Sequence, residues 1–171
     1  MIERNDVVSL KGNPITLLGY EVKIGDKTPD FFVVDNELNP IQFAKDYKGK
    51  KCLIISVPSL DTSVCDLETR RFNKEAENMD NDLAILVISM DLPFAQKRWC
   101  GAAGIERLKT LSDYQQASFG AAFGILIKEI KLLARAIFLI DQSGTIKYIQ
   151  IIKEVTSEPY YEEVLDAIKS L

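Results

Sequence analysis

The chain has 171 residues, a net charge of −4, and 47% hydrophobic and 27% charged residues. These values suit a single globular domain over residues 1–171, and the lack of a strong basic cluster argues against nucleic-acid binding. No apolar stretch reaches the ~18 residues of a membrane helix, and residues 1–6 lack the pattern of a signal peptide, so we expect a cytoplasmic protein without membrane contact.

Hydrophobic periodicity and turn residues predict the elements in chain order. Two short strands, Val7–Leu10 and Ile15–Leu18, flank a hairpin turn at Lys11–Pro14. Further strands are predicted at 31–34, 52–57, 83–89, 110–113, 134–140 and 145–152, the last two joined by a turn at 141–144. Helices are predicted at 66–79, 93–103 and 158–170, with one helical turn at 41–47 and a glycine-containing loop at 120–124.

This order predicts an α/β fold with a mixed sheet. The apolar run Cys52–Val57 is typical of a central strand buried on both faces. Parallel β-α-β units followed by an antiparallel pair place helices on both faces of the sheet. The order is thioredoxin-like, with residues 1–22 as an added N-terminal β-hairpin. On the 66–79 helix we expect Leu67, Phe72 and Ala76 to form the apolar side.

The chain contains three cysteines and no histidine. Ser-His-Asp and Cys-His catalysis and all histidine-containing metal sites are therefore excluded. Cys52, Cys65 and Cys100 form no C-x-x-C pair, and no phosphate-binding glycine motif is present, so no metal or cofactor is expected. Structural disulfides are rare in the cytosol. Any chemistry must therefore depend mainly on cysteine and arginine.

Cys65 is the strongest candidate for that chemistry. It follows the predicted central strand and lies in or next to the first turn of the next helix. Free backbone N–H groups and the positive end of the helix dipole gather there and favour a thiolate over a thiol. Because the thiolate is the nucleophilic form of cysteine, the position indicates a reactive residue.

Three other residues have both a structural and a functional interpretation. The Thr62 hydroxyl can cap the helix, or it can bond the Cys65 thiolate and its substrate. Pro58 can simply end the strand, or it can form a rigid apolar wall that keeps water from the sulfur. Arg135 can lie at an exposed strand end, or it can face the thiolate, since a buried unpaired guanidinium is costly and arginine stays charged.

The pattern Pro58-x-x-x-Thr62-x-x-Cys65, with Arg135 further along, resembles the P-x-x-x-T-x-x-C active site of peroxiredoxins. The segments 58–65, 91–101 and 133–138 together resemble the bacterial thiol peroxidase branch, an atypical 2-Cys peroxiredoxin group, and the likeness spans nearly the whole chain. The resemblance implies a thioredoxin-like fold and a peroxidase that protects against oxidants. By position, Cys65 matches the peroxidatic cysteine, Cys100 the resolving cysteine, and Pro58, Thr62 and Arg135 the remaining active-site residues.

The same resemblance implies the reaction cycle. Cys65 would be oxidised to a sulfenic acid by hydrogen peroxide or an alkyl hydroperoxide and then form a Cys65–Cys100 disulfide. Thioredoxin, regenerated with NADPH by its reductase, would reduce this disulfide, and the protein would be a homodimer. Cys52 matches no functional position and is expected to be a core residue.

The two cysteines of this cycle lie on different predicted helices. A disulfide needs Cα atoms within roughly 7 Å, so we expect local unwinding around one or both cysteines during turnover. Cys100 also has a plainer interpretation, in which Phe94, Trp99 and Cys100 form the apolar face of a helix. Two other functions remain open: a disulfide oxidoreductase or isomerase, which generally uses adjacent cysteines, and a non-enzymatic redox sensor or binding module.

Overall fold

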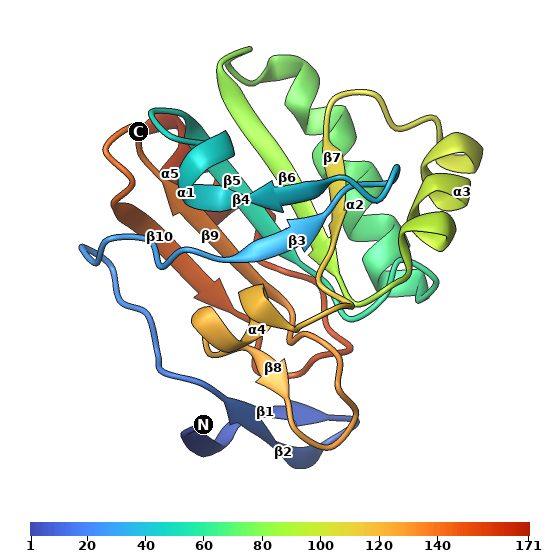
Figure 1. Ribbon diagram of the computed structural model, residues 1–171, viewed down its shortest axis with the longest axis vertical. Coiled ribbons are helices and arrows are strands. Elements are labelled where there is room, and N and C mark those ends of the chain that lie inside the picture. Colours follow the sequence, from blue (N-terminus) through green and yellow to red (C-terminus); the bar gives the residue numbers. More distant parts are fainter.

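The computed structural model describes residues 1–171, which form ten strands and five α-helices (Figure 1). The strands are β1 (Glu3–Leu10), β2 (Asn13–Leu18), β3 (Phe32–Val34), β4 (Pro40–Gln42), β5 (Lys51–Ser56), β6 (Leu83–Ser89), β7 (Lys109–Ser112), β8 (Leu126–Ile127), β9 (Ala136–Ile140) and β10 (Ile146–Ile151). The helices are α1 (Phe43–Asp46), α2 (Ser63–Glu75), α3 (Pro93–Ala103), α4 (Ser118–Ala122) and α5 (Tyr161–Lys169), with a 3₁₀ turn, η1 (Ala76–Asn78).

The main sheet has seven strands in the order β10-β9-β5-β6-β7-β3-β4. Strands β5, β6 and β7 are parallel, whereas β9 lies antiparallel to β5 and β10 antiparallel to β9. The predicted mixed α/β sheet is therefore confirmed. Because β5 and β6 are parallel, the connections that follow them leave the sheet at the same edge and lead into α2 and α3 (Figure 1).

Strand β5 separates two hydrophobic cores. Cys52 and Ile54 join the core that also contains side chains of α1, α4 and the β1–β2 hairpin. Leu53 and Ile55 join the core that contains side chains of α2 and α5. Successive side chains of a strand point to opposite faces, so the continuous apolar run is what a strand covered by helices on both sides requires. Because both faces of β5 are buried, the strand that leads to Cys65 is held in place.

The N-terminal hairpin forms as predicted, with a shorter turn. Leu10 pairs with Asn13, so only Lys11 and Gly12 connect the strands, and both have positive φ angles of 51° and 79°. Two positive φ angles in a two-residue loop match the twist of the flanking strands, and glycine adopts such a φ without strain. The hairpin belongs to a separate sheet with order β1-β2-β8. The two-residue strand β8 and the edge strand β4 have too little periodicity to be predicted.

Three sequence predictions are wrong in detail. Leu67 is 56% exposed, because the buried face of α2 instead contains Cys65, Glu68, Thr69 and Phe72. Residues 118–122 form α4 where a loop was expected, since the buried Asp113 carboxylate accepts hydrogen bonds from the N–H groups of residues 119 and 120. Strand β9 begins one residue after Arg135 rather than before it.

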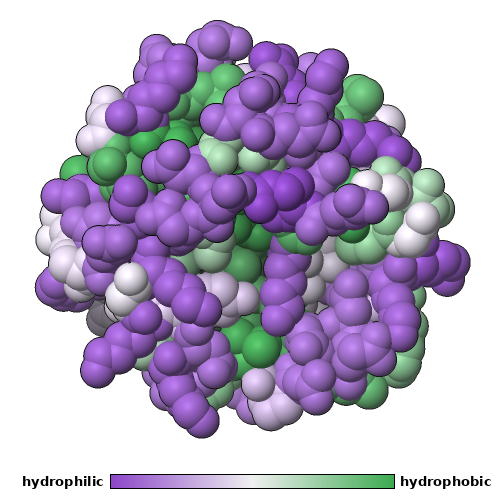
Figure 2. Space-filling view, turned by 90° about the horizontal axis from the view of Figure 1, so that it is seen from above, coloured by the Kyte–Doolittle hydropathy of each residue, from purple (hydrophilic) through white to green (hydrophobic).

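The surface is polar over the face seen in Figure 2, where hydrophobic side chains appear only in separate small groups. None of the helices combines the length and the apolar character that a bilayer-spanning segment needs.

Candidate active site

Cys65 is the third residue of α2 and is fully buried. Its backbone N–H donates to the Oγ1 atom of Thr62, the N-cap residue, at 3.4 Å. The Thr62 hydroxyl in turn donates to the Ser59 carbonyl at 3.0 Å. The sequence placed Cys65 in the first turn of a helix, and the structure places it there. The hydroxyl of Thr62 therefore acts here as a helix cap, while Thr62 itself lies exposed at the surface.

Arg135 lies against the sulfur of Cys65. Its Nη2 atom donates to Cys65 Sγ at 3.3 Å, and its Nε and Nη2 atoms donate to the Val155 carbonyl at 3.2 and 3.0 Å. The arginine is buried, which excludes the exposed strand end considered from the sequence. The Val155 carbonyl fixes the plane of the guanidinium, so one edge is held against the sulfur.

Glu68 is the site residue that sequence reasoning missed. It is fully buried one turn after Cys65 on the same face of α2, and its Oε2 atom forms an ion pair with Arg135 Nη1. A glutamate on an amphipathic helix is ordinarily expected to face solvent. Two features together could have identified Glu68 from the sequence. A buried arginine needs a counter-charge, and an acid stands three residues after the cysteine.

One guanidinium thus faces two acidic groups. Burial raises the pKa of Glu68 to about 7, although Arg135 opposes this shift. Burial alone would lower the pKa of Arg135, but the charges of Glu68 and Cys65 raise it above its usual value. Arg135 therefore stays a cation. The other carboxyl oxygen of Glu68, Oε1, has no hydrogen-bond partner. At neutral pH this carboxyl group carries a proton part of the time.

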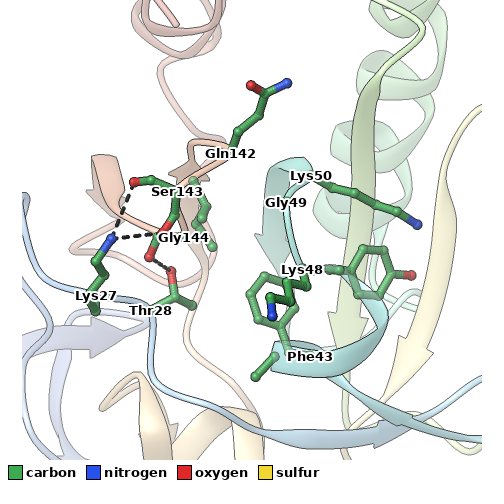
Figure 3. A pocket seen from close by; sticks show the side chains of 12 residues that line it. Lys27, Thr28, Phe43, Lys48, Gly49, Lys50, Gln142, Ser143 and Gly144 are labelled. Atoms are coloured by element: carbon green, nitrogen blue, oxygen red, sulfur yellow. Dashed lines mark hydrogen bonds between the residues drawn. The ribbon is translucent and has the colours of Figure 1, made fainter.

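Pro58 is buried in the segment that leads from β5 to α2. Five cavities of about 140 to 440 Å³ indent the molecule, and Cys65 lines none of them. One such cavity, of about 420 Å³, lies between α1 and the β9–β10 turn, where Lys27 binds Ser143 and Thr145, and its lining contains none of the predicted site residues (Figure 3). Because Cys65 has no solvent-exposed surface, a substrate reaches its sulfur only when surrounding residues move.

Cys100 lies on α3 and is partly buried. Its Sγ atom is 3.3 Å from Thr110 Oγ1, whose hydroxyl donates to Asn36. Cys52, Cys65 and Cys100 are all free thiols in this structure, so Cys65 and Cys100 are not joined. The plainer interpretation of α3 is wrong for Phe94, which is 64% exposed, whereas Trp99 packs against the core and Cys100 is partly buried.

A polar contact joins the two helices that carry Cys65 and Cys100. Trp99 Nε1 donates to Asp66 Oδ1 at 2.8 Å, and Arg70 binds both oxygens of the same carboxylate at 2.9 Å. The Arg70 guanidinium also lies over the Trp99 ring, 5.7 Å from its centroid. The residues adjacent in sequence to the two cysteines are therefore bonded to each other.

Cys52 lies in the interior of β5 with no access to solvent. Burial raises the pKa of its thiol to about 12, so it stays protonated at neutral pH. Because a buried thiol of this kind is a poor nucleophile, Cys52 acts as a core residue. No three cysteine, aspartate or glutamate side chains gather in an arrangement that could hold a metal ion.

Comparisons with known proteins agree with this geometry. The Redoxin family matches residues 23–165. A peroxiredoxin-like protein from Aquifex aeolicus has a crystal structure that superposes with a TM-score of 0.89 at 42% identity, covering 98% of this chain and 96% of that one. The chain therefore belongs to the redoxin family, with a peroxiredoxin fold.

Its curated relatives define the branch. A thiol peroxidase of Halalkalibacterium halodurans is 52% identical over 95% of this chain and 97% of its own length. A thiol peroxidase of Bacillus subtilis is 50% identical over 96% of this chain and 97% of its own length. Within the redoxins, the chain thus groups with the bacterial thiol peroxidases, and the resemblance noted from the sequence is confirmed.

Proposed function

We propose that the chain reduces hydrogen peroxide and organic hydroperoxides through the thiol of Cys65. The observation that carries this proposal is the contact of 3.3 Å between the Arg135 guanidinium and the Cys65 sulfur at the N-terminus of α2. Both the cation and the helix terminus stabilise a thiolate without any histidine. Relatives of about half identical sequence are named thiol peroxidases, which supports the same assignment here.

In the first step, the Cys65 thiolate attacks the terminal oxygen of R-O-O-H. A sulfur–oxygen bond forms while the oxygen–oxygen bond breaks, giving a sulfenic acid and an alkoxide that takes up a proton to leave as alcohol or water. Arg135 and backbone N–H groups at the start of α2 would hold the two oxygens, and Thr62 would assist if its hydroxyl turned from the Ser59 carbonyl. Fixed donors of this kind stabilise the charge that develops on the leaving oxygen.

In the second step, Cys100 attacks the sulfenic acid, and water leaves as the Cys65–Cys100 disulfide forms. The two thiols are separate in the reduced structure, so the proposal includes local unwinding of α2, α3 or both. Thioredoxin is the proposed reductant, and its dithiol becomes a disulfide as both protein thiols are restored. A homodimer in the cytoplasm, with an antioxidant role, completes the proposal.

A single-turnover experiment tests the chemistry without any partner. Reduced protein is mixed with one equivalent of hydrogen peroxide, and the remaining peroxide and the free thiols are counted. The proposal predicts that one peroxide is consumed as two thiols are lost, with a peptide map that joins Cys65 to Cys100. Consumption of peroxide with an intact Cys65 thiol would contradict it.

A further inference from the structure

Asp91 lies between β6 and α3 and bonds the segment that precedes Cys65. Its Oδ1 atom accepts from the Ser59 hydroxyl at 2.6 Å, and its Oδ2 atom accepts from the Leu60 N–H at 2.8 Å and the Ser89 hydroxyl at 2.7 Å. Hydrogen bonds to an ionised acceptor are roughly twice as strong as neutral ones. One carboxylate therefore joins the β5–α2 segment to the end of β6, and Figure 1 shows these two connections at the same edge of the sheet.

The segment 58–62 has no other hydrogen-bonded attachment to the rest of the fold, apart from the first turn of α2. Its remaining hydrogen bonds are internal or lead into that turn: Thr62 N and Oγ1 donate to the Ser59 carbonyl, and Asp61 N donates to the Ser59 hydroxyl. Burial of Pro58 and of the Leu60 side chain restrains the segment further. Asp91 thus provides the hydrogen bonds that attach Ser59 and Leu60, and through Ser59 also Thr62, to the rest of the fold.

From Ser59 a short chain of contacts reaches the reactive cysteine. The Ser59 carbonyl fixes the Thr62 hydroxyl, and this hydroxyl accepts from the Cys65 N–H. Asp91 is therefore linked through Ser59 and Thr62 to the first turn of α2, which carries Cys65. A displacement of about 1 Å in such a turn can change a rate by about 100-fold.

Asp91 is itself held by rigid elements. The Ser112 hydroxyl at the end of β7 donates to the Asp91 carbonyl. The buried Gln96 of α3 donates to the Ser89 hydroxyl at 3.0 Å and to the Leu111 carbonyl at 2.9 Å. Asp91 is thus held by residues of β6, β7 and α3, and its carboxylate in turn holds the segment that contains Thr62.

We propose that Asp91 is a positioning residue for the peroxide reaction: it holds the segment 58–62 and the first turn of α2 where a peroxide meets the Cys65 sulfur. The inference rests on the proposed peroxidase function. Asp91 forms no hydrogen bond or ion pair with Cys65 or Arg135, so its loss would leave the hydrogen bond between these two residues in place. It should affect the reaction with peroxide far more than the amount of thiolate.

The test uses the full chain with Cys100→Ser, so that only the first step is observed. Asp91→Ala and Asp91→Asn are compared with the parent, and Asp141→Asn is the matched control, because Asp141 bonds Ser143 and Thr145 in a turn remote from Cys65. Two quantities are measured: the second-order rate constant for loss of the Cys65 thiol to hydrogen peroxide, and the thiolate ultraviolet absorbance at neutral pH. Cys52 adds nothing to that absorbance, since the pKa of its thiol is about 12.

We expect Asp91→Ala to lower the rate constant by about 10- to 100-fold with little change in thiolate absorbance. Asp91→Asn, which can still bond Ser59 and Leu60, should restore part of the rate, and Asp141→Asn should match the parent. A rate for Asp91→Ala within about twofold of an active parent, or a loss of rate matched by an equal loss of thiolate, would overturn the inference alone. A parent that reduces no peroxide would overturn the proposed function and this inference together.

Discussion

Trp99 and Asp66 are joined by a hydrogen bond of 2.8 Å that ties the helix of Cys65 to the helix of Cys100. Each residue is the immediate neighbour of one of the cysteines. We expect unwinding around either cysteine to break this bond, whereas the Asp66–Arg70 pair, which lies within α2, is lost only if α2 unwinds. We predict that the bond opposes the unwinding proposed for the second step.

Replacing Trp99 with phenylalanine should speed disulfide formation. The ring is kept but the N–H donor is lost, and a partly exposed bond of this kind is worth about 1 kcal/mol, which corresponds to about a fivefold faster second step. Rapid quenching with a thiol reagent after one equivalent of peroxide measures the rate. The exposed Phe94 on the same helix provides the control, Phe94→Leu. Equal rates for Trp99→Phe and wild type would show that the bond does not limit unwinding.

Glu68 should make stability fall as pH rises. Burial raises its folded pKa to about 7, above the ~4.3 of a free glutamate, so between these values the folded chain keeps a proton that the unfolded chain has lost. Glu68→Gln removes this loss. The melting temperature of the variant minus that of wild type should therefore increase from about pH 4 to 7 and then level off.

Thermal unfolding of both proteins across this pH range provides the measurement. The buried Asp113 also has a raised pKa, of about 6, but it is present in both proteins and cancels in the difference. A difference that stays constant, or that declines with pH, would mean that Glu68 is ionised throughout the range.

Arg135→Lys should lower the rate of Cys65 oxidation by about 100-fold. Lysine keeps the charge, but its compact ammonium group lacks the widely spaced, planar donors with which the guanidinium reaches Cys65, Glu68 and the Val155 carbonyl. The rate constant with hydrogen peroxide is measured by rapid mixing, with the exposed Arg98→Lys as control. An unchanged rate for Arg135→Lys would show that a nearby positive charge suffices.

The sequence allowed the fold and most of the site to be predicted because the signals were local or familiar. The apolar run at Cys52–Val57 indicated the central strand, and the family pattern brought Cys65 and Arg135 together although 70 residues separate them. Glu68 was missed because its burial depends on Arg135, a partner in a distant segment. Asp91 was part of a recognised segment, but its bonds to Ser59 and Leu60 depend on how two loops meet.

Cys100→Ser should allow one turnover with peroxide and then impair recycling by thioredoxin. Without the second thiol, the Cys65 sulfenic acid cannot form the intramolecular disulfide that thioredoxin is proposed to reduce. Counting the peroxide consumed per chain, first alone and then with thioredoxin present, separates the two phases. Steady recycling at the wild-type rate would remove Cys100 from the cycle.

We propose that Cys65 is the residue oxidised by peroxide. NADPH consumption with thioredoxin, its reductase and a small panel of hydroperoxides tests it most directly, with wild type, Cys65→Ser and Cys52→Ser compared in one assay. We predict peroxide-dependent consumption by wild type and Cys52→Ser, and none above background by Cys65→Ser. Sustained peroxide-dependent consumption by Cys65→Ser would contradict the account.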